Sequence, residues 1–165
     1  MLGIFLDLET TGLDYFKNRV IEIAYCVVDL ESGAQVESYT TFIYQPEAIW
    51  QQSDKKSLAV NGCCPEIVVT APSESMVAAT IEKQFQRLKI GRDSSIFICQ
   101  NPSFDRPFFA QLIPSSLQEM YKWPYHWLDL ASMYFALSVK ERKKVGFALQ
   151  GGLSKNRIAQ SLQLA

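Results

Sequence analysis

Two acidic side chains stand two residues apart in a segment that is otherwise apolar. Residues 5–13 read FLDLETTGL, so Asp7 and Glu9 alternate with leucines in a pattern typical of a β-strand. Side chains two apart on a strand point to the same face, and both carboxylates would project together from the strand's carboxyl end. Such a pair loses hydration and repels itself, and no basic residue lies within the segment. Mg²⁺ or Mn²⁺, which prefer oxygen ligands, would relieve that repulsion.

A third carboxylate favours a metal site over the alternative, in which the strand simply ends here and water solvates both acids. Asp105 closes the segment CQNPSFD (residues 99–105), just past an apolar strand expected over 95–100 and within a helix expected over 103–113. Open α/β sheets bind their ligands at the carboxyl ends of their strands. Three acids from two strand ends can hold two metal ions about 3.5–4 Å apart, an arrangement that serves in-line displacement at phosphorus.

These two segments resemble a known family. FLDLETTGL together with NPSFDRPFF (residues 101–109) is similar to the first two motifs of the DEDD-type 3′–5′ exonucleases, in particular the His branch (DEDDh, DnaQ-like). That superfamily includes polymerase proofreading subunits, ribonuclease T and oligoribonuclease. The likeness continues in VIEIA (residues 20–24) and in AVNG (residues 59–62), where relatives often read V-H-G-I. It implies a metal-dependent 3′–5′ exonuclease that acts on DNA or RNA and releases nucleoside 5′-monophosphates.

The resemblance also assigns roles to individual residues. It implies that Asp7, Glu9 and Asp105 are the catalytic residues and the ligands of two Mg²⁺ or Mn²⁺ ions. It also implies substrate-binding residues. Those that would line the pocket for the terminal nucleotide are Thr10, Thr11, Gly12 and Leu13. Asn101 would orient the site, and Phe104 would pack against the substrate or support Asp105. Helical spacing offers a second reading for Phe104, Phe108 and Phe109, namely ordinary core packing, which we favour for the last two.

A third motif of the family has no match in these 165 residues. It consists of a His five residues, or a Tyr four residues, before a final Asp. The single histidine, His126, precedes Asp129 by three residues. Tyr125 stands four before Asp129, but that motif works on a helix, and here Pro124 and the Trp127–Leu130 segment indicate a strand. We therefore expect a single domain over residues 1–165 that lacks its C-terminal helix and third motif. The alternative is a catalytically degenerate nucleic-acid-binding or polymerase-complex subunit.

The elements that must position these residues follow from periodicity and turn signals. Strands are expected near 2–8, 20–30, 35–44, 95–100 and 127–130, and helices over 53–62, from 73 or 75 onward, over 103–113, up to about 138, and from a cap at Ser154. The first strand reads as buried on both faces, and Met76, Ile81, Phe85 and Leu88 predict the buried stripe of the second helix. Together they predict an α/β fold with a ribonuclease H-like mixed five-stranded sheet, three antiparallel strands followed by parallel ones, flanked by helices.

Composition and charge limit the classes of partner that this chain can have. Sixteen Lys and Arg balance seventeen Asp and Glu, which argues against a polycation. No apolar run has the 18 or so residues of a membrane span, and the four cysteines lack metal-type spacing, which favours a reducing cytoplasm. The basic residues after Ser138 are Lys140, Arg142, Lys143, Lys144, Lys155 and Arg157, against Glu141 alone. This cluster either holds a single-stranded 3′ end or is a solvated basic loop. A polymerase subunit and a second copy of the chain are the other partners we consider.

Overall fold

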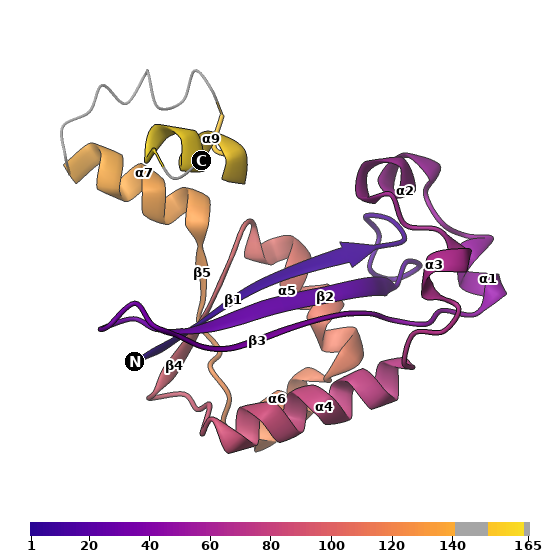
Figure 1. Cartoon of the computed structure of the whole chain (residues 1–165), viewed down its shortest axis with the longest axis horizontal. Helices are drawn as coiled ribbons and strands as arrows, with labels where there is room; N and C mark the ends of the chain where they lie inside the picture. The colour runs from indigo at the N-terminus through magenta and orange to yellow at the C-terminus, as the bar shows by residue number, and fades with distance from the viewer. Residues whose placement is uncertain (141–151, 164–165) are drawn as a thin grey trace.

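The chain folds around a five-stranded mixed sheet in the order β3-β2-β1-β4-β5 (Figure 1). The structure is a computed structural model that describes residues 1–140 and 152–163. The strands are β1 (Leu2–Thr10), β2 (Val20–Asp29), β3 (Gln35–Phe42), β4 (Ser95–Cys99) and β5 (Trp127–Asp129). β1, β2 and β3 pair antiparallel in succession, whereas β4 runs parallel to β1 and β5 runs parallel to β4. The predicted α/β fold with three antiparallel strands followed by parallel ones is confirmed.

Helices cover both sides and one end of this sheet. Figure 1 shows α4 and α6 on the opposite side of the strands from α7 and α9, while α1, α2 and α3 gather beyond the carboxyl end of β1. The helices are α1 (Glu47–Trp50), α2 (Lys55–Asn61), α3 (Pro65–Val68), α4 (Glu74–Arg87), α5 (Pro102–Leu112), α6 (Ser115–Met120), α7 (Leu130–Lys140) and α9 (Lys155–Ser161). The sequence did not predict α1, α3 or α6, because four to six residues are too few to display a helical period. In the described ranges no helix is both long and apolar enough to cross a membrane.

The two faces of β1 differ, which corrects the prediction of a strand buried on both. Ile4, Leu6 and Leu8 are buried in the core that α4 and α5 complete. On the other face Phe5 is 38% exposed and the Asp7 side chain is 53% exposed. A strand covered on one side only must alternate, so the acidic pair lies on the open face of the sheet.

The buried stripe of α4 differs from the predicted one at its first position, where Val77 replaces Met76. Val77, Ile81 and Phe85, each four residues apart, are fully buried, whereas Met76 is 61% exposed. Adjacent positions on a helix point about 100° apart, so the prediction of Met76 as a core residue was wrong although Ile81 and Phe85 were correct. Of the two predicted starting positions the structure has the earlier one, since Ser73 is the N-cap and its Oγ accepts a hydrogen bond from the Met76 N–H at 3.4 Å.

We expect Phe85→Ala to lower the free energy of unfolding by about 3–5 kcal/mol, because truncation of a buried ring leaves a cavity. The Phe85 ring packs 4.8 Å from the Trp123 ring and 5.4 Å from that of Tyr25, centroid to centroid. Urea unfolding would measure the change. The matched control on the same helix, Met76→Ala, should stay within about 0.5 kcal/mol. Equal losses in the two variants would contradict the orientation of α4.

Candidate active site

The acidic pair of β1 gains a third carboxylate from the neighbouring strand. The antiparallel register of β1 and β2 places Glu9 opposite Glu22, and Asp7 opposite Ala24. A register shift between Glu9 and Thr10 then ends the regular ladder, and the chain leaves the sheet for the β1–β2 loop. Burial, the negative charge of Asp7 and then that of Glu22 raise the pKa of Glu9 above its ordinary value. Burial and the charge of Asp7 raise the pKa of Glu22 in the same way.

Asp105 is the buried member of this acidic group. It lies in the first turn of α5 and is only 2% exposed. Burial first, and then the negative charge of Asp7, raise its pKa to about 7, although Lys155 and a hydrogen bond from the backbone of Leu8 act in the opposite direction. The charge of Asp7 therefore acts on both Glu9 and Asp105.

A lysine from the last described helix stands inside this group. Lys155 is the first residue of α9, and its Nζ lies 2.5 Å from Asp7 Oδ1. Its positive charge partly offsets the rise in the pKa values of Glu9 and Asp105. Within residues 1–140 and 152–163, no three His, Cys, Asp or Glu side chains come close enough together to hold one metal ion. The three predicted ligands thus interact through their charges, with an ammonium group as their countercharge.

A pocket of about 310 Å³ opens beside Glu9. Four of the predicted site residues line it, namely Glu9, Thr10, Leu13 and Phe104, together with Leu8 and with Asp54, Lys56, Ser57, Val60 and Asn61 from α2 and its cap. Leu13 is 72% exposed and Val60 is 88% exposed, so two apolar side chains border the opening. The Phe104 ring also packs 5.0 Å from the Phe108 ring, and it therefore belongs both to the pocket wall and to the edge of the core.

Thr11 and Gly12 do not line this pocket but shape the loop that does. Thr11 is fully buried, and its Oγ1 accepts a hydrogen bond from the Arg19 N–H at 3.0 Å. A side chain at Gly12 would begin 2.4 Å from Asn18 Oδ1, so only glycine fits there. Asn18 is itself held in place, because its Oδ1 accepts a hydrogen bond from the Asp14 N–H at 3.0 Å.

Asn101 positions the start of α5. Its backbone is left-handed (φ 60°), a conformation that asparagine tolerates better than most residues. Its N–H donates to Asp129 Oδ1 at 3.1 Å, and Ser103 Oγ donates to Asn101 Oδ1 at 2.5 Å. Asp129 thus connects the ends of β4 and β5. It ends a strand and precedes α7, so Tyr125 and Asp129 do not share a helix, as the sequence predicted.

Three further residues of the site were not assigned to the acidic group from the sequence, although Lys155 was predicted as part of the basic cluster. Glu22 needed the strand register, and Lys155 needed the tertiary placement of α9. Asn61 had a signal, because it stands where relatives carry a histidine; its Nδ2 donates to the Thr10 carbonyl at 3.0 Å, and its hydrogen bond to Glu9 lowers the pKa of that acid.

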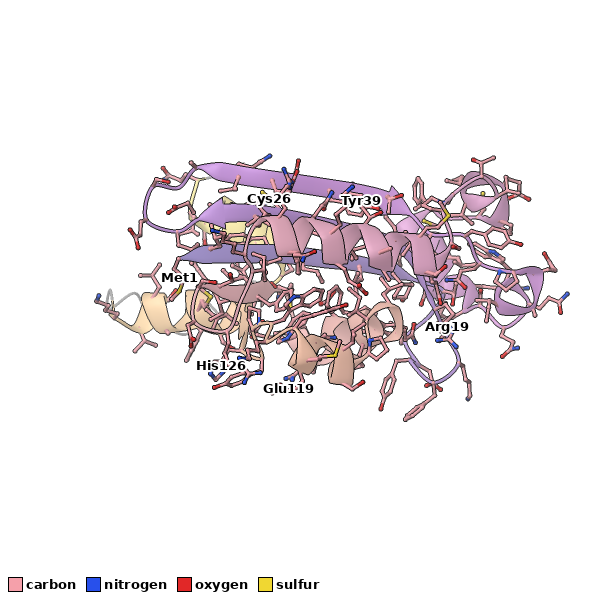
Figure 2. The ribbon with its side chains drawn as sticks, turned by 90° about the horizontal axis from the view of Figure 1, so that it is seen from below. Met1, Arg19, Cys26, Tyr39, Glu119 and His126 are labelled. Atoms are coloured by element: carbon pink, nitrogen blue, oxygen red, sulfur yellow. The ribbon has the colours of Figure 1, made fainter. Side chains whose placement is uncertain are left out.

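The lone histidine lies elsewhere, and part of the basic cluster is not described. His126 is exposed, and Figure 2 shows it at the lower edge of the molecule, apart from Arg19 at the end of the β1–β2 loop. From the predicted basic cluster, Arg142, Lys143 and Lys144 lie outside the described residues.

Comparison with known proteins places this arrangement in a family. The RNase T family model, described as an exonuclease, matches residues 4–144. The chain belongs to this exonuclease family. Two curated relatives are oligoribonucleases. That of Azoarcus sp. is 29% identical over 118 residues, which cover 68% of this chain and 63% of the relative. That of Sodalis glossinidius is 29% identical over 164 residues, which cover 96% of this chain and 84% of the relative. The chain therefore spans less than two thirds of the Azoarcus protein.

Solved structures share the fold of this exonuclease-family chain. Exonuclease I of E. coli, in complex with a dA16 oligonucleotide, superimposes with a TM-score of 0.67 at 15% identity. The match covers 86% of this chain and 31% of that one. At this identity the likeness concerns the fold, and it agrees with the ribonuclease H-like sheet predicted from the sequence.

We expect Asp105→Asn to stabilise the metal-free protein above neutral pH. The folded-state pKa of about 7 exceeds the unfolded value, so the wild type loses stability as pH rises from about 4 through 7, whereas the amide does not titrate. The gain at pH 8 should reach at most about 4 kcal/mol, since one pKa unit is worth about 1.4 kcal/mol, and it should vanish near pH 4. Thermal melts in EDTA between pH 4 and 8 would measure it.

Asp129→Asn is the matched control and should have the opposite sign. Although partial burial alone would raise the pKa of Asp129, hydrogen bonds from Ser132 and from the backbone of Asn101 and Ala131 hold it below its ordinary value. Its ionised form therefore stabilises the fold above about pH 4, and the variant should melt at a lower temperature than wild type at pH 8. Loss of stability at every pH in Asp105→Asn would contradict the charge repulsion described here.

Proposed function

We propose that this chain carries the catalytic site of a metal-dependent 3′–5′ exonuclease that removes nucleoside 5′-monophosphates from single-stranded nucleic acid. One observation supports this most directly: Glu9 belongs both to the acidic group and to the wall of the 310 Å³ pocket. A terminal base held in that pocket would leave the adjoining phosphate beside Asp7 and Asp105. The apolar side chains of Leu13, Val60 and Phe104 suit the faces of a base.

The residues that would hold divalent cations are Asp7, Glu9 and Asp105. Their carboxylate oxygens are the donors that Mg²⁺ and Mn²⁺ prefer, and the raised pKa values of Glu9 and Asp105 indicate that a nearby positive charge would stabilise their ionised forms. Two bound ions would supply charge stabilisation for the attacking and leaving oxygens at phosphorus. For all three acids to share the ions, the Lys155 ammonium must leave Asp7 and the carboxylates must draw closer together.

The chain's own residues position the reactants. Asn61 ties α2 to the end of β1 through the Thr10 carbonyl, which keeps Val60 across the pocket from Leu13. The backbone hydrogen bond from Leu8 keeps Asp105 against the strand that carries the other acids.

Short RNA is the first substrate class to test. The curated relatives are named oligoribonucleases, whereas the structural likeness to exonuclease I, solved with a DNA oligonucleotide, concerns the fold alone. A matched pair of RNA and DNA oligonucleotides would separate the two sugars, because a site that hydrogen-bonds the 2′-hydroxyl discriminates between them.

A second candidate function is a nucleic-acid-binding subunit without catalysis. The Lys155–Asp7 ion pair favours it, because a permanent ammonium group would serve the acids as a structural countercharge in place of metal. The two candidates differ in whether a divalent cation displaces Lys155.

We expect Asp7→Ala to reduce the release of 3′-terminal nucleotides by at least about 100-fold while the fold is retained. Removal of a metal ligand should exceed the 10–100-fold effects seen for residues that merely support ligands. The assay is a denaturing gel of 5′-labelled RNA and DNA pentamers with Mg²⁺ or Mn²⁺, with circular dichroism to check the fold. Asp93→Ala, which removes an exposed acid between α4 and β4, is the control and should leave the rate unchanged. No release by the wild type with either metal would instead support the second candidate.

Lys155→Gln should bind Mn²⁺ about 2- to 5-fold more tightly than the wild type. A half-exposed ion pair is worth about 0.5–1 kcal/mol, and the metal no longer has to displace it. Electron paramagnetic resonance of free Mn²⁺ would give the dissociation constants. The control Arg157→Gln makes the same charge change on the same helix and should have a smaller effect. Equal affinities for wild type and Lys155→Gln would mean that the lysine and the metal do not compete.

A further inference from the structure

The β1–β2 loop (residues 11–19) presents two aromatic rings to water. Phe16 is 82% exposed and Tyr15 is 43% exposed, and their ring centroids lie 4.2 Å apart at an interplanar angle of 32°. Large aromatic side chains are normally buried, and adjacent exposed rings form a surface that suits another flat, apolar group. The active site described above makes no use of this pair.

The rings stand on a loop whose backbone is fixed. Gln111 of α5 donates from Nε2 to the Tyr15 carbonyl at 2.7 Å and to the Asn18 carbonyl at 3.0 Å. Within the loop, Asp14 accepts hydrogen bonds from the Phe16 N–H at 3.0 Å and, through its carbonyl, from the Asn18 N–H at 2.7 Å. The Tyr15 ring also meets the buried Phe108 edge-on, at 6.4 Å between centroids. A fixed backbone lowers the entropy lost when a ligand stacks on the rings.

The same loop continues into the pocket. Leu13, which borders the pocket opening, is separated from the aromatic pair by Asp14 alone. Two basic side chains lie near: Lys17 follows the pair, is 72% exposed and pairs with Asp14 at 3.4 Å, and Lys56 lines the pocket. Exposed rings beside basic side chains form the surface that binds single strands, since every base has a face to stack and every phosphate a charge to neutralise.

We propose that Phe16 and Tyr15 form a further base-binding subsite, which stacks a base of a single strand beyond the second nucleotide from the 3′ end. This inference rests on the proposed function, because the pocket beside Glu9 must take the 3′ end. The subsite takes the face of a base without hydrogen bonds to its edge, so it accepts any of the bases. It makes affinity depend on substrate length, because a dinucleotide ends before it reaches the rings.

The test compares oligonucleotides of two lengths. Fluorescence anisotropy would follow 5′-fluorescein dinucleotides and octanucleotides of RNA and DNA, with Ca²⁺ in place of Mg²⁺ to hold back hydrolysis. Phe16→Ala should weaken octanucleotide binding about 5- to 150-fold, the equivalent of 1–3 kcal/mol for one stacked base, and change dinucleotide binding less than about twofold. Phe16→Trp should restore octanucleotide binding. An exposed ring outside the site provides the control Tyr121→Ala, which should match the wild type.

A second measurement locates the stacked base. 2-Aminopurine placed at an internal position of the octanucleotide should lose fluorescence on binding the wild type and recover it with Phe16→Ala, and the 3′-terminal position should not respond to this variant.

Each contrary outcome has a distinct meaning. No octanucleotide binding by the wild type would overturn this inference together with the proposed function. Normal wild-type binding with Phe16→Ala indistinguishable from Tyr121→Ala would overturn the inference alone, and the rings would then be a protein-contact surface. Equal weakening of dinucleotide and octanucleotide would place the effect of Phe16 in the terminal pocket and would also overturn it.

Discussion

Mutual repulsion among carboxylates at one edge of the sheet is the constraint on which the rest of this structure depends. Asp7, Glu9 and Glu22 come from two paired strands, and Asp105 comes from the helix that follows a third. Burial raises the pKa values of three of them, and in each case the charge of Asp7 adds to the effect. A fold that collects such groups is less stable for doing so, which is typical of sites arranged for chemistry. This edge of the molecule requires a positive charge, which the Lys155 ammonium group supplies here and which a metal ion could supply in its place.

The sheet reconciles this edge with a stable core by using its two faces differently. One face of β1 packs Ile4, Leu6 and Leu8 against α4 and α5, which buries the apolar side chains that hold the fold together. The other face is open near the acids, where a groove of about 370 Å³ runs between the sheet and α9. Small side chains line it on β2 and β3, namely Ala24, Cys26, Ser38 and Thr40. Asp7 and Lys155 meet at this groove, so their ion pair is accessible to solvent and to ions, whereas the Asp105 side chain is buried.

Binding surface and charge come from segments far apart in the sequence. The pocket joins the end of β1, the loop after it, α2 and the first turn of α5, and hydrogen bonds rather than apolar packing connect these parts. Asn61 bonds the Thr10 carbonyl, Asn18 fills the space beside Gly12, and Gln111 holds the β1–β2 loop to α5. Directional bonds of this kind fix the loop, so that exposed Leu13 and Phe16 keep their places without a core beneath them. The rim of the pocket is therefore fixed by hydrogen bonds between these segments.

Local pattern determined much of this protein. Alternation around Asp7 and Glu9 placed both acids on one face of a strand, since side-chain direction repeats every two residues, and the segment before Asp105 located the second strand end. The antiparallel start and the later strand–helix order predicted the sheet, because tight turns and crossovers leave few other topologies. One member of the α4 stripe was predicted wrongly, because Met76 and Val77 are both apolar and only the packed core distinguishes them.

Long-range contacts decided the remainder. Glu9 lies opposite Glu22 because of the register of β1 and β2. Lys155 pairs with Asp7 because α9 packs near the acids, and the pocket forms because α2 lies beside Leu13. None of these has a local signal, because each depends on interactions between segments from ten to nearly 150 residues apart. Local sequence therefore determined which groups this chain offers for chemistry, and tertiary packing determined which of them lie close enough to interact electrostatically.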